Sequence, residues 1–195
     1  MNELIPASRS RQVASGQTQV LNVKQYLTFL LGGETFGIGI LCIKEIIEYA
    51  GLTEVPLMPP SIRGVINLRG AVVPVLDLAV RFGKVPGEVT KKTCVVIVEV
   101  HTEDARHIMG VVVDAVNAVQ KIAEADIEPA PGFGAKIRTD FIEGMGKVNG
   151  KFVILLNVSQ VLSVQELGAL NQAAAESDVQ AKAIPASIKS LQSSG

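Results

Sequence analysis

The sequence predicts a mainly β protein built from two copies of a small antiparallel barrel or sandwich. Three observations predict this class: short runs of β-branched residues recur, hairpin-turn signals separate them, and strands do not alternate with long helices. Hydrophobic residues make up 48% of the 195 residues and charged residues 19%. Such an aliphatic chain needs a buried core or an apolar interface for its Val, Ile and Leu side chains.

The composition also argues against several classes of function. Lys and Arg number 18 and Asp and Glu 19, so the net charge of -1 argues against binding of nucleic acid or anionic lipid. The longest apolar stretches, such as Phe36–Ile43, are shorter than the ~18 residues of a membrane helix, and the first residues do not resemble a secretion signal. We therefore expect a cytoplasmic protein with no direct membrane insertion. Cys42 and Cys94 lie in apolar runs, which predicts core thiols.

The expected strands follow one another between two tails. Residues 1–23 are rich in Ser, Gln and Asn and predict a flexible tail. The segment Gln25–Leu31 is β-rich and ends at Gly32-Gly33, a two-residue hairpin signal. Further strands are expected over Thr93–Val100 and Lys151–Leu156, the second preceded by the hairpin signal Asn149-Gly150.

A helix is expected near the end of the chain. Ser163 and Glu166 have the spacing of a capping box, and an apolar face follows them. Residues 177–195 are rich in Ala, Ser, Gln and Lys and are not expected to pack. The region 166–195 is therefore predicted to be a C-terminal helix followed by a flexible tail.

The chain contains an internal repeat. Residues 64–78 align without a gap with residues 144–158, which lie 80 positions later. In this block Asp77 matches Asn157, and each is placed to cap a short helix after its strand.

A second block supports the same repeat. Gly37-Ile38 matches Gly110-Val111 at an offset of 73 residues, and the aliphatic residues that follow continue the match. Two blocks in the same order predict two copies of one strand-rich unit within residues 24–165, one over about 24–90 and the other over about 91–165.

The inventory of nucleophiles, acids and bases is small, and it predicts no catalytic site, metal or cofactor. Four weak candidates are better explained by structure than by chemistry. They are a metal site from His101, Glu103, Asp104 and His107, a nucleophile at Cys42, a phosphate loop over Gly32–Gly39, and a carboxylate pair of Asp77 and Asp114.

Arg69 breaks a local rule. By the repeat it occupies the turn position that Asn149 holds in the second copy, directly before Gly70. A tight two-residue turn favours Asn, Asp or Gly there because its φ is positive. Arg in that place indicates a functional requirement, whereas a longer turn of another type would accept Arg without one.

The segment Gly64-Val-Ile-Asn-Leu-Arg-Gly, followed by Val-Val-Pro-Val-Leu-Asp-Leu at 72–78, resembles the signature of the CheW-like chemotaxis coupling proteins. The resemblance covers about 24–165. The same domain occurs in CheA kinases and CheV-type proteins, which need a further domain, so we expect a stand-alone coupling protein. Further motifs stand in the family's order: Phe36-Gly-Ile, Ile43-Lys-Glu-Ile-Ile, Met109-Gly-Val-Val-Val-Asp, Pro129-Ala-Pro and Gly144 to Asn157.

The resemblance implies two SH3-like, five-stranded antiparallel β-barrels that share a core. It also implies a non-enzymatic adaptor, without a cofactor, that links the cytoplasmic tips of methyl-accepting chemoreceptors to the regulatory domain of the CheA histidine kinase in membrane-associated arrays. Exposed Val and Ile patches would pack against the kinase, and a groove between the barrels would take a receptor helix. An adaptor for another chemosensory system, or a small-ligand module on a double barrel, remains an alternative.

The resemblance also implies which residues bind partners. Arg69 matches the family's functionally sensitive arginine, while Glu45 and Ile43 match the acidic and aliphatic positions of its short helical segment. We expect Glu45 and Arg69 to approach each other, in a pair that orients the loop because exposed ion pairs stabilise a fold by only a few tenths of a kcal/mol. The full set of expected partner-binding residues is Ile43, Glu45, Gly64, Asn67, Arg69 and Gly70.

Overall fold

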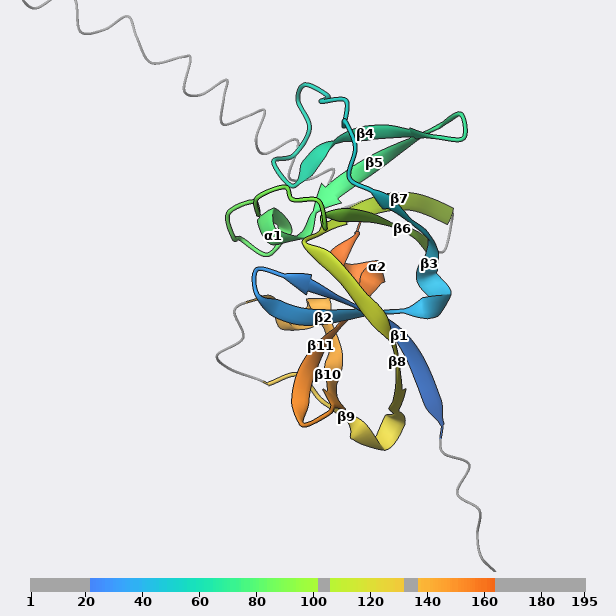
Figure 1. Cartoon of the computed structure of the whole chain (residues 1–195), viewed down its shortest axis with the longest axis vertical. Coiled ribbons are helices and arrows are strands. Elements are labelled where there is room, and N and C mark those ends of the chain that lie inside the picture. The colour runs from blue at the N-terminus through green and yellow to red at the C-terminus, as the bar shows by residue number, and fades with distance from the viewer. Residues whose placement is uncertain (1–21, 102–105, 132–136, 164–195) are drawn as a thin grey trace, which may run out of the picture.

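Two curled sheets, joined by short helical turns, form the fold of the computed structural model, which describes residues 22–101, 106–131 and 137–163 (Figure 1). The strands are β1 Val23–Leu31, β2 Glu34–Gly39, β3 Ile43–Glu48, β4 Ile62–Leu68, β5 Ala71–Asp77, β6 Cys94–His101, β7 Arg106–Val113, β8 Ala115–Ala123, β9 Ile127–Glu128, β10 Ile142–Val148 and β11 Lys151–Leu156. The helical segments are η1 Ile40–Cys42, α1 Leu78–Arg81, η2 Glu124–Asp126, η3 Thr139–Phe141 and α2 Val158–Val161.

The predicted turns and caps are confirmed. Gly32 and Gly33, with φ of 58° and 81°, connect β1 to β2 in a two-residue turn. Asp77 accepts a hydrogen bond from the backbone N–H of Val80 at 3.1 Å and so caps α1. The matching Asn157 caps α2 in the same way, through the N–H of Gln160 at 3.3 Å.

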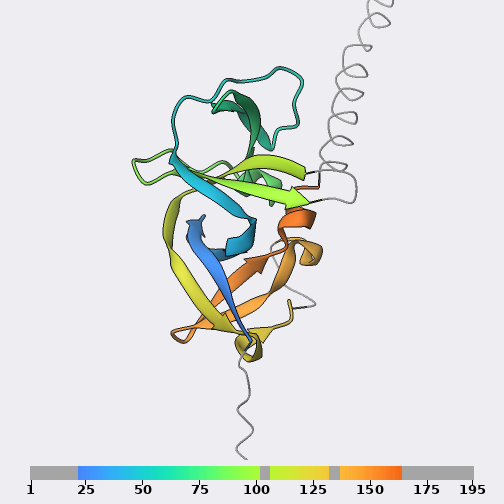
Figure 2. The same ribbon diagram turned by 90° about the vertical axis from the view of Figure 1, so that its right-hand side faces the viewer.

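The two sheets exchange strands between the two repeats. Sheet A has the strand order β8-β1-β2-β11-β10-β9, and sheet B has the order β3-β6-β7-β5-β4. Within sheet A, β2 runs parallel to β11, and within sheet B, β5 runs parallel to β7; the other neighbours are antiparallel. The hairpin β1-β2 of the first repeat therefore lies in sheet A with β8 to β11 of the second repeat. The hairpin β6-β7 of the second repeat lies in sheet B with β3 to β5 of the first (Figure 2).

This exchange corrects the expected division into a barrel over 24–90 and a barrel over 91–165. The mainly β pseudo-repeat is confirmed, but the boundary near residue 90 separates two repeats and not two sheets. An internal repeat predicts the order of elements along the chain, and it does not say which copy supplies the neighbouring strand. The expected tails and C-terminal helix lie outside the described residues, except that β1 already begins at Val23.

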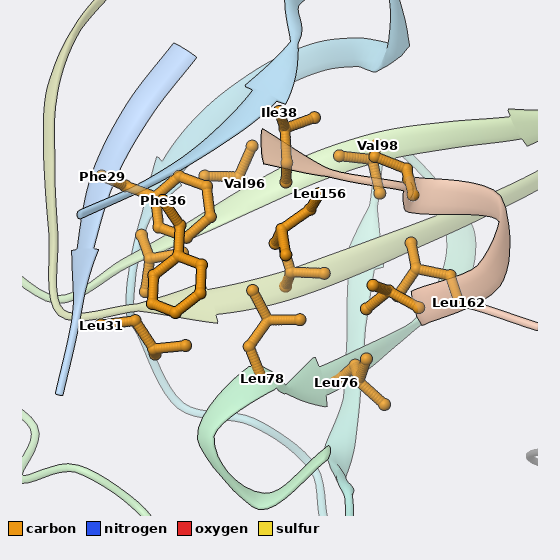
Figure 3. Close-up of a cluster of buried hydrophobic side chains, with 14 of the residues drawn as sticks. Phe29, Leu31, Phe36, Ile38, Leu76, Leu78, Val96, Val98, Leu156 and Leu162 are labelled. Carbon is orange, nitrogen blue, oxygen red and sulfur yellow. The ribbon is translucent and has the colours of Figure 1, made fainter. Parts of the chain in front are cut away.

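One core lies between the sheets and joins both repeats. Side chains of β1 and β2 meet those of β6, α1 and α2 in a continuous apolar cluster (Figure 3). Leu76 and Leu156, matched in the repeat, are both fully buried in it. Smaller clusters fill the interior of each curled sheet, around Tyr26 in sheet A and around Val75 in sheet B. No helix in the described ranges is long and apolar enough to cross a membrane.

Four phenylalanines extend this core from β1 to η3. Phe29, Phe36, Phe82 and Phe141 follow one another with ring centroids 6.1, 5.7 and 6.0 Å apart. Arg81, at the end of α1, lies over the last ring at 4.8 Å, and its Nε donates to the carbonyl of Val161 in α2 at 3.0 Å. The two capped helices are thereby tied to each other at the junction of the sheets.

Gly64 allows the segment before β4 to pack against that strand. Thr53 and Val65 exchange two backbone hydrogen bonds, of 3.0 and 2.8 Å. Gly64 lies beside them with a φ of 150°, and a Cβ on it would stand 2.5 Å from the carbonyl oxygen of Thr53. A side chain at this position must displace backbone, so glycine is required here by close approach.

We expect Gly64→Ala to lower the free energy of unfolding by about 2 kcal/mol or more, because the clash falls on backbone and the φ disfavours a side chain. Chemical denaturation measures the loss. Gly51→Ala is the control, because no heavy atom lies within 4 Å of a Cβ built there. Equal stability of the two variants would contradict this account of Gly64.

Candidate functional site

Arg69 occupies the left-handed position of a tight turn between β4 and β5. Its φ is 53° and that of Gly70 is 90°, and the flanking Leu68 and Ala71 are paired. Two consecutive positive φ values define the turn that the twist of a two-residue hairpin favours. The matched turn in sheet A, with Asn149 at 49°, has the same form. The tight-turn interpretation is thus confirmed over that of a longer turn.

The side chain of Asn67 holds this turn from within. Its Oδ1 accepts a hydrogen bond from the backbone N–H of Gly70 at 2.8 Å. The matching position in the second hairpin is Lys147, whose ammonium group pairs with Glu128. The two hairpins therefore share a backbone shape, while the side chains at this matched position make different contacts.

The expected approach of Arg69 and Glu45 is confirmed. Nη2 of Arg69 lies 3.0 Å from Oε2 of Glu45. The arginine side chain is 80% exposed and that of the glutamate 28%. Glu45 lies on β3, one edge strand of sheet B, and Arg69 follows β4, the other edge strand. The pair spans the gap between the two edges, and because it is exposed it stabilises the fold by only a few tenths of a kcal/mol.

Ile43 and Glu45 do not lie on a helix, which corrects one implication of the resemblance. The short helical turn η1 ends at Cys42, and both residues belong to β3. The β-branched Ile46 and Ile47 favour an extended strand, and β3 pairs with β6 along its length. A register shift between Ile43 and Glu45 interrupts the alternation. Ile43 is consequently packed against the shared core.

The structure therefore divides the six expected residues. Glu45, Asn67, Arg69 and Gly70 come together at one end of sheet B. Gly64 lies toward the opposite end of β4, where it serves the close approach to Thr53 and not the turn.

Exposed apolar side chains on β3, on β5 and on the turn η1 before β3 were not named by the sequence reasoning. Leu41 on η1 is 98% exposed, Ile46 on β3 42% and Val72 on β5 73%. The sequence offers no alternation that would have placed Ile46 or Val72 outward, because Ile46 stands beside Ile47 and β5 is apolar from Ala71 to Leu76. Leu41 carries no signal either, because its exposure depends on the three-residue turn between two strands.

Charged groups gather beside this site on β3 and β6. Glu99 pairs with Lys44 and lies 3.1 Å from Nε2 of His101. The hydrogen bond from Lys44 lowers the pKa of the Glu99 carboxyl, with the charge of His101 adding to it. This glutamate therefore stays ionised at neutral pH, and its pair with Lys44 links β3 to β6 at the register shift of β3.

The remaining candidates have structural partners. Asp77 is ion-paired with Arg63 at 3.2 Å in addition to capping α1, and Asp114 accepts from the N–H of Gly32 at 2.7 Å. Cys42 and Cys94 are free and half-buried, not fully buried as expected; burial raises the pKa of the Cys42 thiol. In the described ranges no three His, Cys, Asp or Glu side chains gather as metal ligands; Glu103 and Asp104 lie outside those ranges.

Comparison with known proteins agrees with this arrangement. The model of the CheW-like domain matches residues 25–166. The chain is 33% identical over 156 residues to the chemotaxis protein CheW of Helicobacter pylori, which covers 79% of this chain and 92% of the relative. It is 32% identical over 151 residues to chemotaxis protein CheW of Klebsiella aerogenes, covering 77% and 89%.

A solved structure is similar as well. The scaffolding protein TtCheW of Thermoanaerobacter tengcongensis matches with a TM-score of 0.66 and 35% identity, over 72% of this chain and 88% of that chain. The similarity extends across most of both chains, so it applies to the whole double-sheet arrangement and not to one hairpin.

We expect Arg69→Asn to be more stable than Arg69→Ala by about 1 kcal/mol. Both variants lose the pair with Glu45, but Asn accepts a left-handed φ more readily than Ala does. Urea unfolding at equal m-values measures the difference. A lower stability of Arg69→Asn would show that the turn does not impose the conformational cost described above.

Proposed function

The chain belongs to the CheW-like domain family, and from that premise we propose that it is a non-enzymatic chemotaxis scaffold that couples chemoreceptors to the histidine kinase CheA. The observation that carries the proposal is the conformation of Arg69. A long cationic side chain stands where the hairpin favours Asn or Gly, and it remains 80% exposed. Local stability does not explain that choice, whereas recognition of a partner does.

The regulatory domain of CheA is the proposed partner of the exposed end of sheet B. Ile46 on β3 and Val72 on β5, with Leu41 on the turn η1 that precedes β3, supply exposed apolar contact area near Glu45 and Arg69. Protein interfaces combine a central apolar contact with a few Arg and polar groups that set the orientation. In this arrangement Arg69 orients the kinase domain and the aliphatic side chains provide most of the binding energy.

A helix at the cytoplasmic tip of a chemoreceptor is the proposed second partner, placed where the two sheets meet. The side chains that meet at this junction, from β2, β7, β11 and both capped helices, are apolar and largely buried, with a small gap between them. Helices bind such surfaces through apolar residues on one face. The scaffold would then act in the cytoplasm, at membrane-associated receptor arrays, by holding receptor and kinase in a fixed relation.

The proposal is tested by titrating the full chain with a purified CheA regulatory domain and, separately, with a receptor cytoplasmic fragment. We expect each to bind with a Kd of tens of micromolar or tighter, and Arg69→Ala to weaken kinase binding by about tenfold. The thermal midpoint of Arg69→Ala should change by less than about 2 °C, because the residue makes only an exposed contact.

Lys92→Ala serves as the control, since Lys92 is an exposed cation on the loop before β6. It should bind both partners as the unmodified chain does. No complex with either partner would contradict the proposal. A collapse of the thermal midpoint in Arg69→Ala would instead make Arg69 a structural residue.

A further inference from the structure

We propose that Asn67 is a positioning residue, which acts on partner binding through Arg69 and not by contacting the partner. This inference rests on the proposed function and adds to it the means by which the Arg69 side chain is presented. It follows from comparing two hairpins that the repeat makes equivalent and that differ at two positions which bear on the turn, 67/147 and 69/149.

The first difference concerns the turn residue itself. In the hairpin of sheet A, Asn149 has a φ of 49°, which suits asparagine without outside help. In the hairpin of sheet B, Arg69 adopts nearly the same φ, of 53°, without that intrinsic preference. The conformation of the turn at Arg69 therefore needs another source of stability.

The second difference supplies it. Asn67 Oδ1 accepts the backbone N–H of Gly70 at 2.8 Å, which fixes the residue after Arg69 against the end of β4. The matching Lys147 has no such acceptor, and its ammonium group pairs with Glu128 instead. In the hairpin of sheet A the turn residue itself is an asparagine, Asn149. In the hairpin of sheet B the asparagine stands two residues before the turn position, at Asn67, so the turn position can hold an arginine.

The head of Arg69 is held separately from its backbone. Glu45 contacts one guanidinium nitrogen at 3.0 Å, while most of the side chain stays exposed. A guanidinium has five N–H donors, so this contact leaves donors for an acceptor on a partner, such as a carboxylate. Asn67 fixes where the side chain starts and Glu45 favours one direction for it, so part of the ordering is in place before a partner arrives.

A double-mutant cycle in kinase binding tests the inference, with the complete chain and the purified CheA regulatory domain. Asn67→Ala should weaken binding about three- to tenfold, the effect of one lost hydrogen bond. In the Arg69→Ala background the same change should have no further effect, because the residue through which it acts is gone. Asn67→Asp should retain binding, since a carboxylate also accepts the N–H of Gly70.

Thr93→Val is the matched control for a general loss of stability. Thr93 Oγ1 accepts the backbone N–H of Thr90 at 2.8 Å, a bond that also joins a backbone N–H to a side-chain oxygen three residues away, in a different part of the fold. This variant should lose stability to a similar degree as Asn67→Ala, measured by urea unfolding, and should bind the kinase domain unchanged.

The outcomes separate the inference from the proposed function. Additive losses for Asn67→Ala and Arg69→Ala, or loss of binding in Asn67→Asp, would overturn the positioning role and make Asn67 a direct contact. An unchanged affinity of Asn67→Ala would also overturn it. If Arg69→Ala itself bound normally, both the positioning role and the proposed site would be wrong.

Discussion

The apolar cluster between the two sheets is the constraint on which the rest of the structure depends. Sheets A and B each bury one face in it, and each sheet is complete only with a hairpin from the other repeat. Neither half of the chain can therefore form a finished sheet or a closed core alone. The stacked phenylalanines and the bond from Arg81 to the carbonyl of Val161 fix how the halves meet. With the core fixed in this way, the hairpin tips and edge strands at the far ends are free to vary in sequence.

The proposed partner site lies where this freedom exists. The turn at Arg69 is exposed, and its backbone conformation suits another residue type better. Two neighbours compensate: the amide of Asn67 stabilises the turn and the carboxylate of Glu45 orients the side chain. The equivalent hairpin of sheet A keeps the residue that suits the turn. A duplicated scaffold has thus left one copy conformationally relaxed and given the other a strained, outward-facing cation.

Sequence reasoning predicted those features that depend on local chemistry. The paired glycines, the caps at Asp77 and Asn157, and the unusual placement of Arg69 all follow from residues within a few positions of each other. It missed features that depend on distant chain segments, namely the strand exchange and the close packing behind Gly64, and it was wrong about the helical conformation of Glu45. The exposure of Leu41 belongs to the same class. The approach of Arg69 to Glu45 was expected from the family resemblance, because two residues 24 positions apart carry no local signal.

Strand exchange has a consequence for how the chain folds as it is synthesised. All strands of sheet B are present once residue 113 has been made, whereas β1 and β2 wait for β8 to β11, the last of which ends at Leu156. The first hairpin of the chain thus remains without its neighbouring strands through most of translation. Contacts of such sequence separation form slowly, and unpaired strand edges are prone to pair wrongly. The order of assembly runs against the order of synthesis: the sheet that contains the first strand is the last to close.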